Sequence, residues 1–235
     1  MQHGGSIGLS GKVNMRILKG GSLSHVPAKE LSLYEIVKHG FPHPWVEREV
    51  AMWRLKNLPN LFRGLWRVLF ARLLRLNNSY GTVSLVKICG DGRQIDYGIA
   101  SMRVVTTAGV GFIVDAFQNT QEVDSFKFHG FGTGTNAESA ANTSLQTELT
   151  TQYATDSVRP TGTQTEGSGA NIYRTVATLS PDSGGTLAIT EHGIFSDADV
   201  GEGVLLDRSV FSAMNLVAGV DSLQTSFDLT LASGG

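Results

Sequence analysis

The C-terminal half of this chain is a succession of short apolar segments separated by turn residues. In the clearest one, 223–231, leucine and phenylalanine recur on one side, with Gln, Ser, Asp and Thr on the other. This alternation is typical of a strand in an antiparallel sheet with one buried and one solvated face. Asp91-Gly92 marks a hairpin turn, and further strands are expected at 82–88, 99–105, 126–131, 172–179, 187–195 and 204–211. The pattern predicts a mainly β fold, an antiparallel β-sandwich of jelly-roll or Ig-like kind.

The residues before the first strand indicate helices instead. A short helix is expected over 32–38, and a second from Trp45, because Val46, Val50 and Trp53 recur at helical spacing. Pro59 is expected to end that helix. A last helix is then expected over 60–76, while 110–118 suits either a helix or a strand and 144–149 a short helix.

The last expected helix, 60–76, is apolar almost all round. Such a helix is normally buried, and a chain of 235 residues offers little to bury it within one domain. We therefore expect another subunit to cover it.

Charge divides the chain into two unlike parts. Residues 1–103 carry 15 Lys and Arg against 6 acids, a net +9, whereas residues 104–235 carry 4 against 15, a net −11. Such a chain attracts a charged partner at one end, or copies of itself head to tail. We expect an extended and helical basic assembly arm over 1–79, Gly- and Ser-rich in its first 22 residues, and an acidic β-sandwich domain over 80–235.

The basic part interleaves arginines with aromatic side chains between residues 45 and 75. Nucleic acid or an anionic membrane would use the arginines for phosphates and the aromatics for stacking or insertion. Packing against another protein is favoured instead, because the same chain carries the acidic half. The expected protein-interface residues are Trp45, Trp53, Phe62, Arg63, Trp66, Arg67, Phe70, Arg72, Leu73 and Arg75.

Composition also restricts the compartment and the chemistry. Cys89 is the only cysteine, so an intrachain disulfide or a thiolate metal cluster cannot form. The first fifteen residues lack the features of a secretion signal, and 61–76 is too short and too rich in arginine to span a membrane. A protein made in the cytoplasm is expected, with either Met1 or Met15 as its start.

Two glycine-containing motifs match the letter patterns of functional sites. Residues 132–137, GTGTNA, match the G-x-G-x-x-A form of a dinucleotide loop. The next clear strand, at Ile172, comes after a long polar stretch and ends without the acid that binds ribose, so a glycine-rich turn is favoured. Residues 4–8, GGSIG, match a nucleophile elbow by letter but lie in the Gly- and Ser-rich leader.

Four groupings of polar residues could in principle act in catalysis or bind a metal. His39 and His43 have zinc-ligand spacing, but Gly40 and two prolines oppose a helix there. Glu191 and His192 point to opposite faces of one strand, so they cannot act as a direct acid–base pair. The remaining candidates are His192 with Asp182 or Asp197 serving Ser196 or Ser209, and a calcium ion on Asp197, Asp199 and Glu202. A histidine hydrogen-bonded at a subunit contact and a solvated turn are favoured, so no catalytic, cofactor or metal residue is assigned.

Residues 104–235 resemble a family of virion structural proteins of tailed bacteriophages. The resemblance lies in the blocks VVTTAGVGFIVDAFQN, FKFHGFGTGTNAE, TSLQTEL, AITEHGIF, LLDRSVF and DSLQTSFDLTL, which occur in order. It implies a β-sandwich present in many copies on a particle, and it leaves residues 1–103 uncovered.

The resulting functional prediction is a non-enzymatic virion protein made in the host cytoplasm. We expect a capsid cement or decoration protein on the capsid surface that clamps neighbouring major capsid subunits and itself forms a trimer or dimer. A tail or head-tail adaptor component is the first alternative, and a host-surface binding module the second. Small-molecule substrates and cofactors are not expected, nor is a membrane partner, and nucleic acid is disfavoured.

Overall fold

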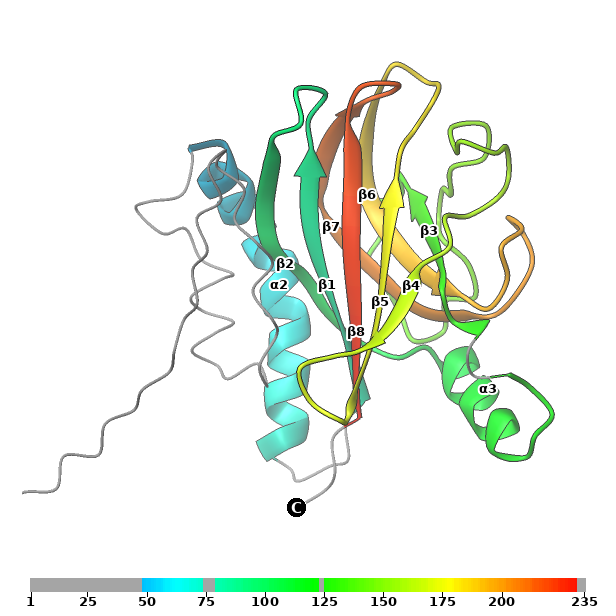
Figure 1. The fold of residues 1–235 in the computed structure, drawn as a ribbon. Helices are drawn as coiled ribbons and strands as arrows, with labels where there is room; N and C mark the ends of the chain where they lie inside the picture. The colour runs from blue at the N-terminus through cyan, green and yellow to red at the C-terminus, as the bar shows by residue number, and fades with distance from the viewer. Residues whose placement is uncertain (1–47, 74–78, 123–124, 232–235) are drawn as a thin grey trace, which may run out of the picture.

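The structure is a computed structural model that describes residues 48–73, 79–122 and 125–231. Two antiparallel sheets pack face to face (Figure 1). The five-stranded sheet has the order β2 (Gln94–Val104), β1 (Ser79–Ile88), β8 (Ser222–Leu231), β5 (Ile172–Leu179), β4 (Thr163–Glu166). The three-stranded sheet has the order β3 (Phe128–Gly132), β6 (Thr186–Phe195), β7 (Leu205–Val217). The prediction of a mainly β antiparallel sandwich is confirmed.

The apolar core lies between the two sheets. Leu85, Phe227 and Ile189 are fully buried there, from β1, β8 and β6. Val50 and Trp53 of the preceding helix belong to the same core, which shows that this helix is packed into the sandwich. Burial of this kind contributes roughly 25 cal/mol per Å² of apolar surface.

The helices differ from the expected ones at Pro59 and over 144–149. One helix, α2 (Arg48–Leu73), runs through Pro59, so the predicted break there is wrong. A proline inside a helix costs about 3 kcal/mol, and packing of α2 on both sheets offsets that cost. The ambiguous segment forms α3 (Thr107–Phe117), with the Thr106 side chain accepting a hydrogen bond from Gly109 N.

The short helix expected at 144–149 is absent, and an extended loop lies there. Leu145 and Leu149 are buried, and Glu148 between them reaches Arg159. Contacts across the loop therefore override the local helix pattern. The helix expected at 32–38, His39, His43 and the GGSIG motif lie outside the described residues.

Helix α2 closes the seam where one edge of each sheet meets the other (Figure 1). Asn57 Nδ2 donates to the carbonyl of Ala100 in β2 at 2.7 Å, and its Oδ1 accepts from Ser212 N in β7 at 2.8 Å. Trp53 Nε1 donates to the carbonyls of Ser212 and Ala213 at 3.0 and 3.1 Å. These side chains give partners to strand edges that would otherwise invite foreign strands.

The close approach of α2 depends on Gly64, where an added Cβ would lie 1.5 Å from the carbonyl oxygen of Met102. Leu61, Leu65 and Val68 of α2 are buried against Met102 and its neighbours. The expectation that another subunit must cover this helix is therefore wrong for its inner face, which the chain's own strands cover.

Candidate protein-interaction site

The outer face of α2 exposes large apolar side chains. Trp66 is 70% exposed, Phe70 52% and Leu73 78%, at positions i, i+4 and i+7 of the helix. Met52 and Leu55 extend the same stripe toward the N-terminus of α2 and are also exposed. Exposed apolar surface gathered on one element marks an interaction site more often than isolated exposed residues do. We call Trp66, Phe70 and Leu73 the α2 face.

The predicted interface residues divide between the two sides of α2. Phe62, Arg63, Trp66, Arg67, Phe70 and Leu73 are exposed. Trp53 is 8% exposed and holds α2 to β7, so it is not available to a partner in this fold. Trp45, Arg75 and the side chain of Arg72 lie outside the described residues.

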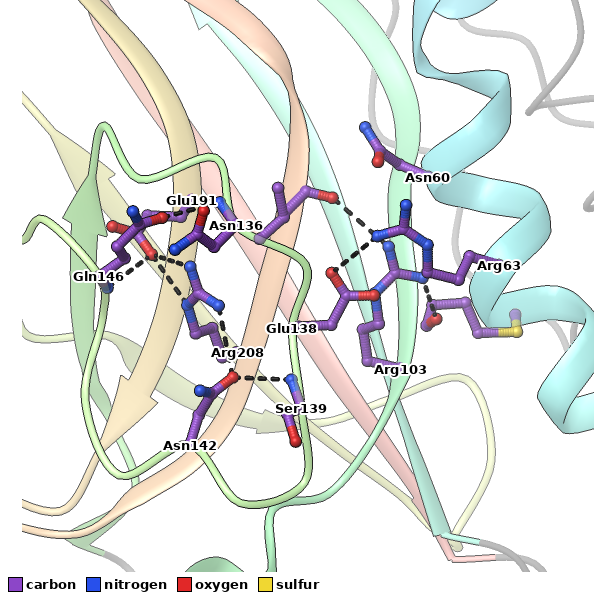
Figure 2. A network of polar contacts seen from close by, with 12 residues as sticks. Asn60, Arg63, Arg103, Asn136, Glu138, Ser139, Asn142, Gln146, Glu191 and Arg208 are labelled. Carbon is purple, nitrogen blue, oxygen red and sulfur yellow. Dashed lines mark hydrogen bonds and ion pairs between the residues drawn. The ribbon is translucent and has the colours of Figure 1, made fainter.

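A basic row runs beside the α2 face and joins a buried ion pair. Arg63 Nη1 lies 3.8 Å from Glu138 Oε2, and the second oxygen of Glu138 lies 2.5 Å from Arg103 Nε (Figure 2). Arg103 is buried whereas Arg63 is 41% exposed, so the Arg63 contact is screened by water and contributes little stability. With Arg67 and Lys56, which are also exposed, Arg63 makes this side of the helix positive.

Helix α3 presents a second exposed apolar face. Val110 is 49% exposed, Val114 48% and Phe117 84%, again at i, i+4 and i+7. On the opposite side of α3, Gly109 lies against Leu206, where an added Cβ would be 2.9 Å from its Cα. Sequence reasoning missed this face, although Thr106 as a helix cap and the i, i+4, i+7 spacing carried the signal. We call Val110, Val114 and Phe117 the α3 face.

The glycine-rich loop after β3 surrounds a carboxylate. Glu191 Oε1 accepts hydrogen bonds from Gly134 N at 3.0 Å and Thr147 N at 2.7 Å. Its Oε2 accepts from Gln146 N at 3.0 Å (Figure 2). Arg208 Nε completes the set at 2.9 Å. A dinucleotide loop would offer such N–H groups to a pyrophosphate. Here Glu191 already occupies the Gly134 N–H, and its negative charge opposes a phosphate.

The turn at 197–202, a candidate calcium site in the sequence, surrounds an arginine. The carbonyls of Asp197, Asp199 and Glu202 all accept from Arg159 Nη1, at 2.9, 2.8 and 3.0 Å. Arg159 also pairs with Glu148, Nε to Oε1 at 2.6 Å. Arg159 thus binds the backbone carbonyls of this turn rather than its three carboxylates, and among residues 48–73, 79–122 and 125–231 no group of three metal-binding side chains is found.

His192 points into the core, away from Glu191 of the same strand. Its Nε2 lies 3.0 Å from His129 Nδ1, and His129 Nε2 lies 3.1 Å from Thr175 Oγ1. Ser209 Oγ donates to Asp207 Oδ1 at 3.0 Å. The favoured reading of His192 as a hydrogen-bonded histidine agrees with this geometry, but its partner is a buried side chain rather than a subunit contact.

Acidification from pH 6.5 to 5 is expected to destabilise the fold through the two buried histidines. Burial lowers the pKa of His192 to about 3 and that of His129 well below its ordinary value, whereas both are about 6.5 when unfolded. As the pH falls through this window, each unfolded histidine goes from about half protonated to almost fully protonated while the native histidines stay neutral, so stability falls as the pH falls. Burial raises the pKa of Asp207 to about 7, which opposes the trend by one proton.

The net expectation is a loss of about 1.4 kcal/mol over this whole window, most of it near pH 5. Urea unfolding at pH 6.5, 5.8 and 5.0 measures it. A His192→Gln variant should flatten the slope whatever its stability at pH 6.5, because one histidine then balances Asp207. An unchanged slope in that variant would contradict the assignment.

Helices of the described residues are all too short or too polar to cross a membrane. Comparison of the chain with protein-family models, with curated proteins and with solved structures found no match.

Proposed function

We propose that this chain is a structural protein of a tailed-bacteriophage particle, a capsid cement protein that clamps neighbouring major capsid subunits. The observation that carries the proposal is the α2 face: Trp66, Phe70 and Leu73 stand exposed on a helix that is fixed to the sandwich. The resemblance of residues 104–235 to virion structural proteins indicates that the particle is a tailed bacteriophage.

The rigidity of α2 supports a role in assembly. The side chains of Trp53 and Asn57 hold the helix to β2 and β7 through hydrogen bonds to strand backbone groups, so the α2 face is ordered before a partner binds. A preordered surface avoids part of the entropy lost on association. Repetition over a particle multiplies the effect of each contact.

The conspicuous polar groups of the sandwich support a structural role as well. Arg159, Glu191 and Arg208 are buried and satisfy one another or loop backbone groups. They stabilise loops and thereby the shape of the particle-facing surface, without needing a substrate. A non-enzymatic function is therefore proposed for this chain.

Two alternatives place the chain elsewhere. A tail or head-tail adaptor component would use the same α2 face. A host-surface binding module would need exposed aromatics on the sandwich loops. Residues 104–235 contain no Trp and only two Tyr; Tyr153 is buried, and Tyr173 donates to the carbonyl of Phe126 at 2.6 Å.

Deletion of the gene from a phage that encodes this chain tests the proposal. A cement protein is expected to leave complete particles whose heads release DNA at a lower temperature, because contacts between capsid subunits are lost. Thermal release of DNA, electron microscopy and copy number by mass spectrometry measure the outcome.

The same experiment separates the alternatives. Tailless heads with few copies of the chain in the wild type point to a tail or adaptor component. Stable complete particles that fail to adsorb to cells point to host binding. Absence of the chain from purified wild-type particles would refute a virion role.

A further inference from the structure

We propose that copies of this chain associate head to tail, with the α2 face of one copy packed on the α3 face of the next. The two faces share one geometry. Trp66, Phe70 and Leu73 are spaced i, i+4, i+7, as are Val110, Val114 and Phe117. Side chains at this spacing form one ridge along two turns of a helix, and such ridges interdigitate when helices pack.

The two faces also differ in size in a complementary way. Trp66 is bulky, whereas Gly111 lies beside Val110 and Val114 on the exposed side of α3, with nothing within 4 Å of where its Cβ would be. Gly111 leaves a shallow place on the α3 face that an indole ring can cover. Aromatic anchors seated against such places carry much of the energy of interfaces.

Charge selects α3 as the partner of α2. The basic row Lys56, Arg63 and Arg67 adjoins the α2 face, while Asp115 adjoins the α3 face and Glu122 is exposed beyond its C-terminal end. Pairing α2 with α2 of another copy would bring the basic rows together, and pairing α3 with α3 would bring the acids together. Like charges in contact disfavour both symmetric pairings.

Charge also selects the orientation of the two helices. Arg67 follows Trp66 as Asp115 follows Val114, so each charge lies about 100° round the helix from that apolar residue, in the same rotational sense. Two helices packed face to face bring equivalent sides together only when they are antiparallel. We therefore assign an antiparallel α2–α3 contact with Arg67 near Asp115.

The positions of the helices make this contact heterologous. Helix α2 lies beside β2, and α3 lies at the far end of the molecule near β3 and β7 (Figure 1). One molecule cannot bring its own α2 face to its own α3 face. Head-to-tail contacts of this kind produce a ring when the rotation closes and a filament when it does not.

The contact is small, so the association is expected to be weak in solution. Two helix faces of two turns each bury less than the roughly 1,600 Å² of a standard stable interface. Self-association at tens to hundreds of micromolar is expected, and it should weaken with NaCl because the flanking charges are screened.

Sedimentation velocity on the full chain tests the inference with two matched variants. Trp66→Ser disables the α2 face and Phe117→Ser disables the α3 face; both side chains are exposed, so melting temperatures should stay at the wild-type value. Each variant alone should associate at least tenfold more weakly than wild type. An equimolar mixture should form a one-to-one dimer and nothing larger, because one intact α2 face meets one intact α3 face.

Two further variants control for position and charge. Val220→Ser, at an exposed apolar residue of the turn before β8, should associate like wild type. Arg67→Glu should weaken association at least threefold, and adding Asp115→Arg in the same chain should restore it. Restoration would support the assigned antiparallel contact.

Distinct results overturn the inference. A wild-type chain that stays monomeric at 300 µM shows that something else covers the α2 face, residues 1–47 included. Undiminished association of Phe117→Ser shows a symmetric α2 contact. The inference concerns the same α2 face as the proposed function, but this experiment uses purified chain without particles, so either proposal can fail while the other stands.

Discussion

Arg159→Met is expected to lower the free energy of unfolding by about 3–5 kcal/mol, the range seen when one partner of a buried ion pair is removed. Arg159 is 2% exposed and joins two loops that are distant in sequence. It pairs with Glu148 from one loop and donates to the carbonyls of Asp197, Asp199 and Glu202 in the other. Methionine fills a similar volume but leaves the carboxylate and three carbonyls without these donors.

Urea unfolding followed by circular dichroism measures this loss. Arg93→Met is the matched control, because Arg93 pairs with Asp91 at 2.8 Å on the surface and its removal should leave the unfolding midpoint unchanged. Arg159→Lys keeps the charge but not the planar fork, so it should fall between Met and wild type. A loss below about 1 kcal/mol for Arg159→Met, the size of an ordinary surface effect, would show that the guanidinium is dispensable.

The strands were predictable because their signal is local. The strand expected at 223–231 and the Asp91-Gly92 turn need only near neighbours in sequence, and both appear in the structure as β8 and the β1–β2 turn. The expected solvated face of β8 is wrong in part, because Ser226 and Asp228 are buried. The same locality explains the helix error. Pro59 lowers helix propensity whatever surrounds it, whereas the packing of α2 on β2 and β7 depends on residues up to 160 positions away.

The candidate site was predictable only in part, because a sequence does not tell which apolar side chains the fold leaves outside. The apolar pattern of 60–76 predicts cover by another subunit for the whole segment, yet Leu61, Leu65 and Val68 pack on the chain's own strands while Trp66 and Phe70 do not. Separating the two sets requires knowing that α2 lies over β2.

Charge counting had the same limitation. The net −11 of residues 104–235 treats every acid as equivalent, but Glu138, Glu191 and Asp228 are buried against arginines. The acids that remain exposed, Asp115 and Glu122 among them, determine what a partner meets. The attraction of copies head to tail therefore depends on where those acids lie relative to α2, which only the fold reveals.

Glu191→Gln is the second substitution with a large expected effect, again about 3–5 kcal/mol of unfolding free energy. Glu191 is fully buried and receives N–H groups from Gly134, Gln146, Thr147 and Arg208. A glutamine has nearly the same shape, but its amide offers one acceptor oxygen and turns an NH2 toward donors. The positive charge of buried Arg208 would also lose its counter-charge.

A double-mutant cycle with Arg208→Met isolates the charge pair. Glu191→Gln with Arg208→Met removes both charges together, so its loss should be smaller than the sum of the two single losses. Additive losses would show that the pair itself carries no coupling.

Hydrogen exchange then tests what Glu191 does for the loop. In Glu191→Gln the amides of Gly134 and Thr147 should exchange faster, because their acceptor Oε1 is lost or inverted. The effect should extend to Glu138, which lies in the same loop and contacts Arg63 beside the α2 face. If exchange in the loop rises while self-association is unchanged, the α2 face is positioned by β2 and β7 alone. If both change, Glu191 also fixes the basic row that a neighbouring copy would meet.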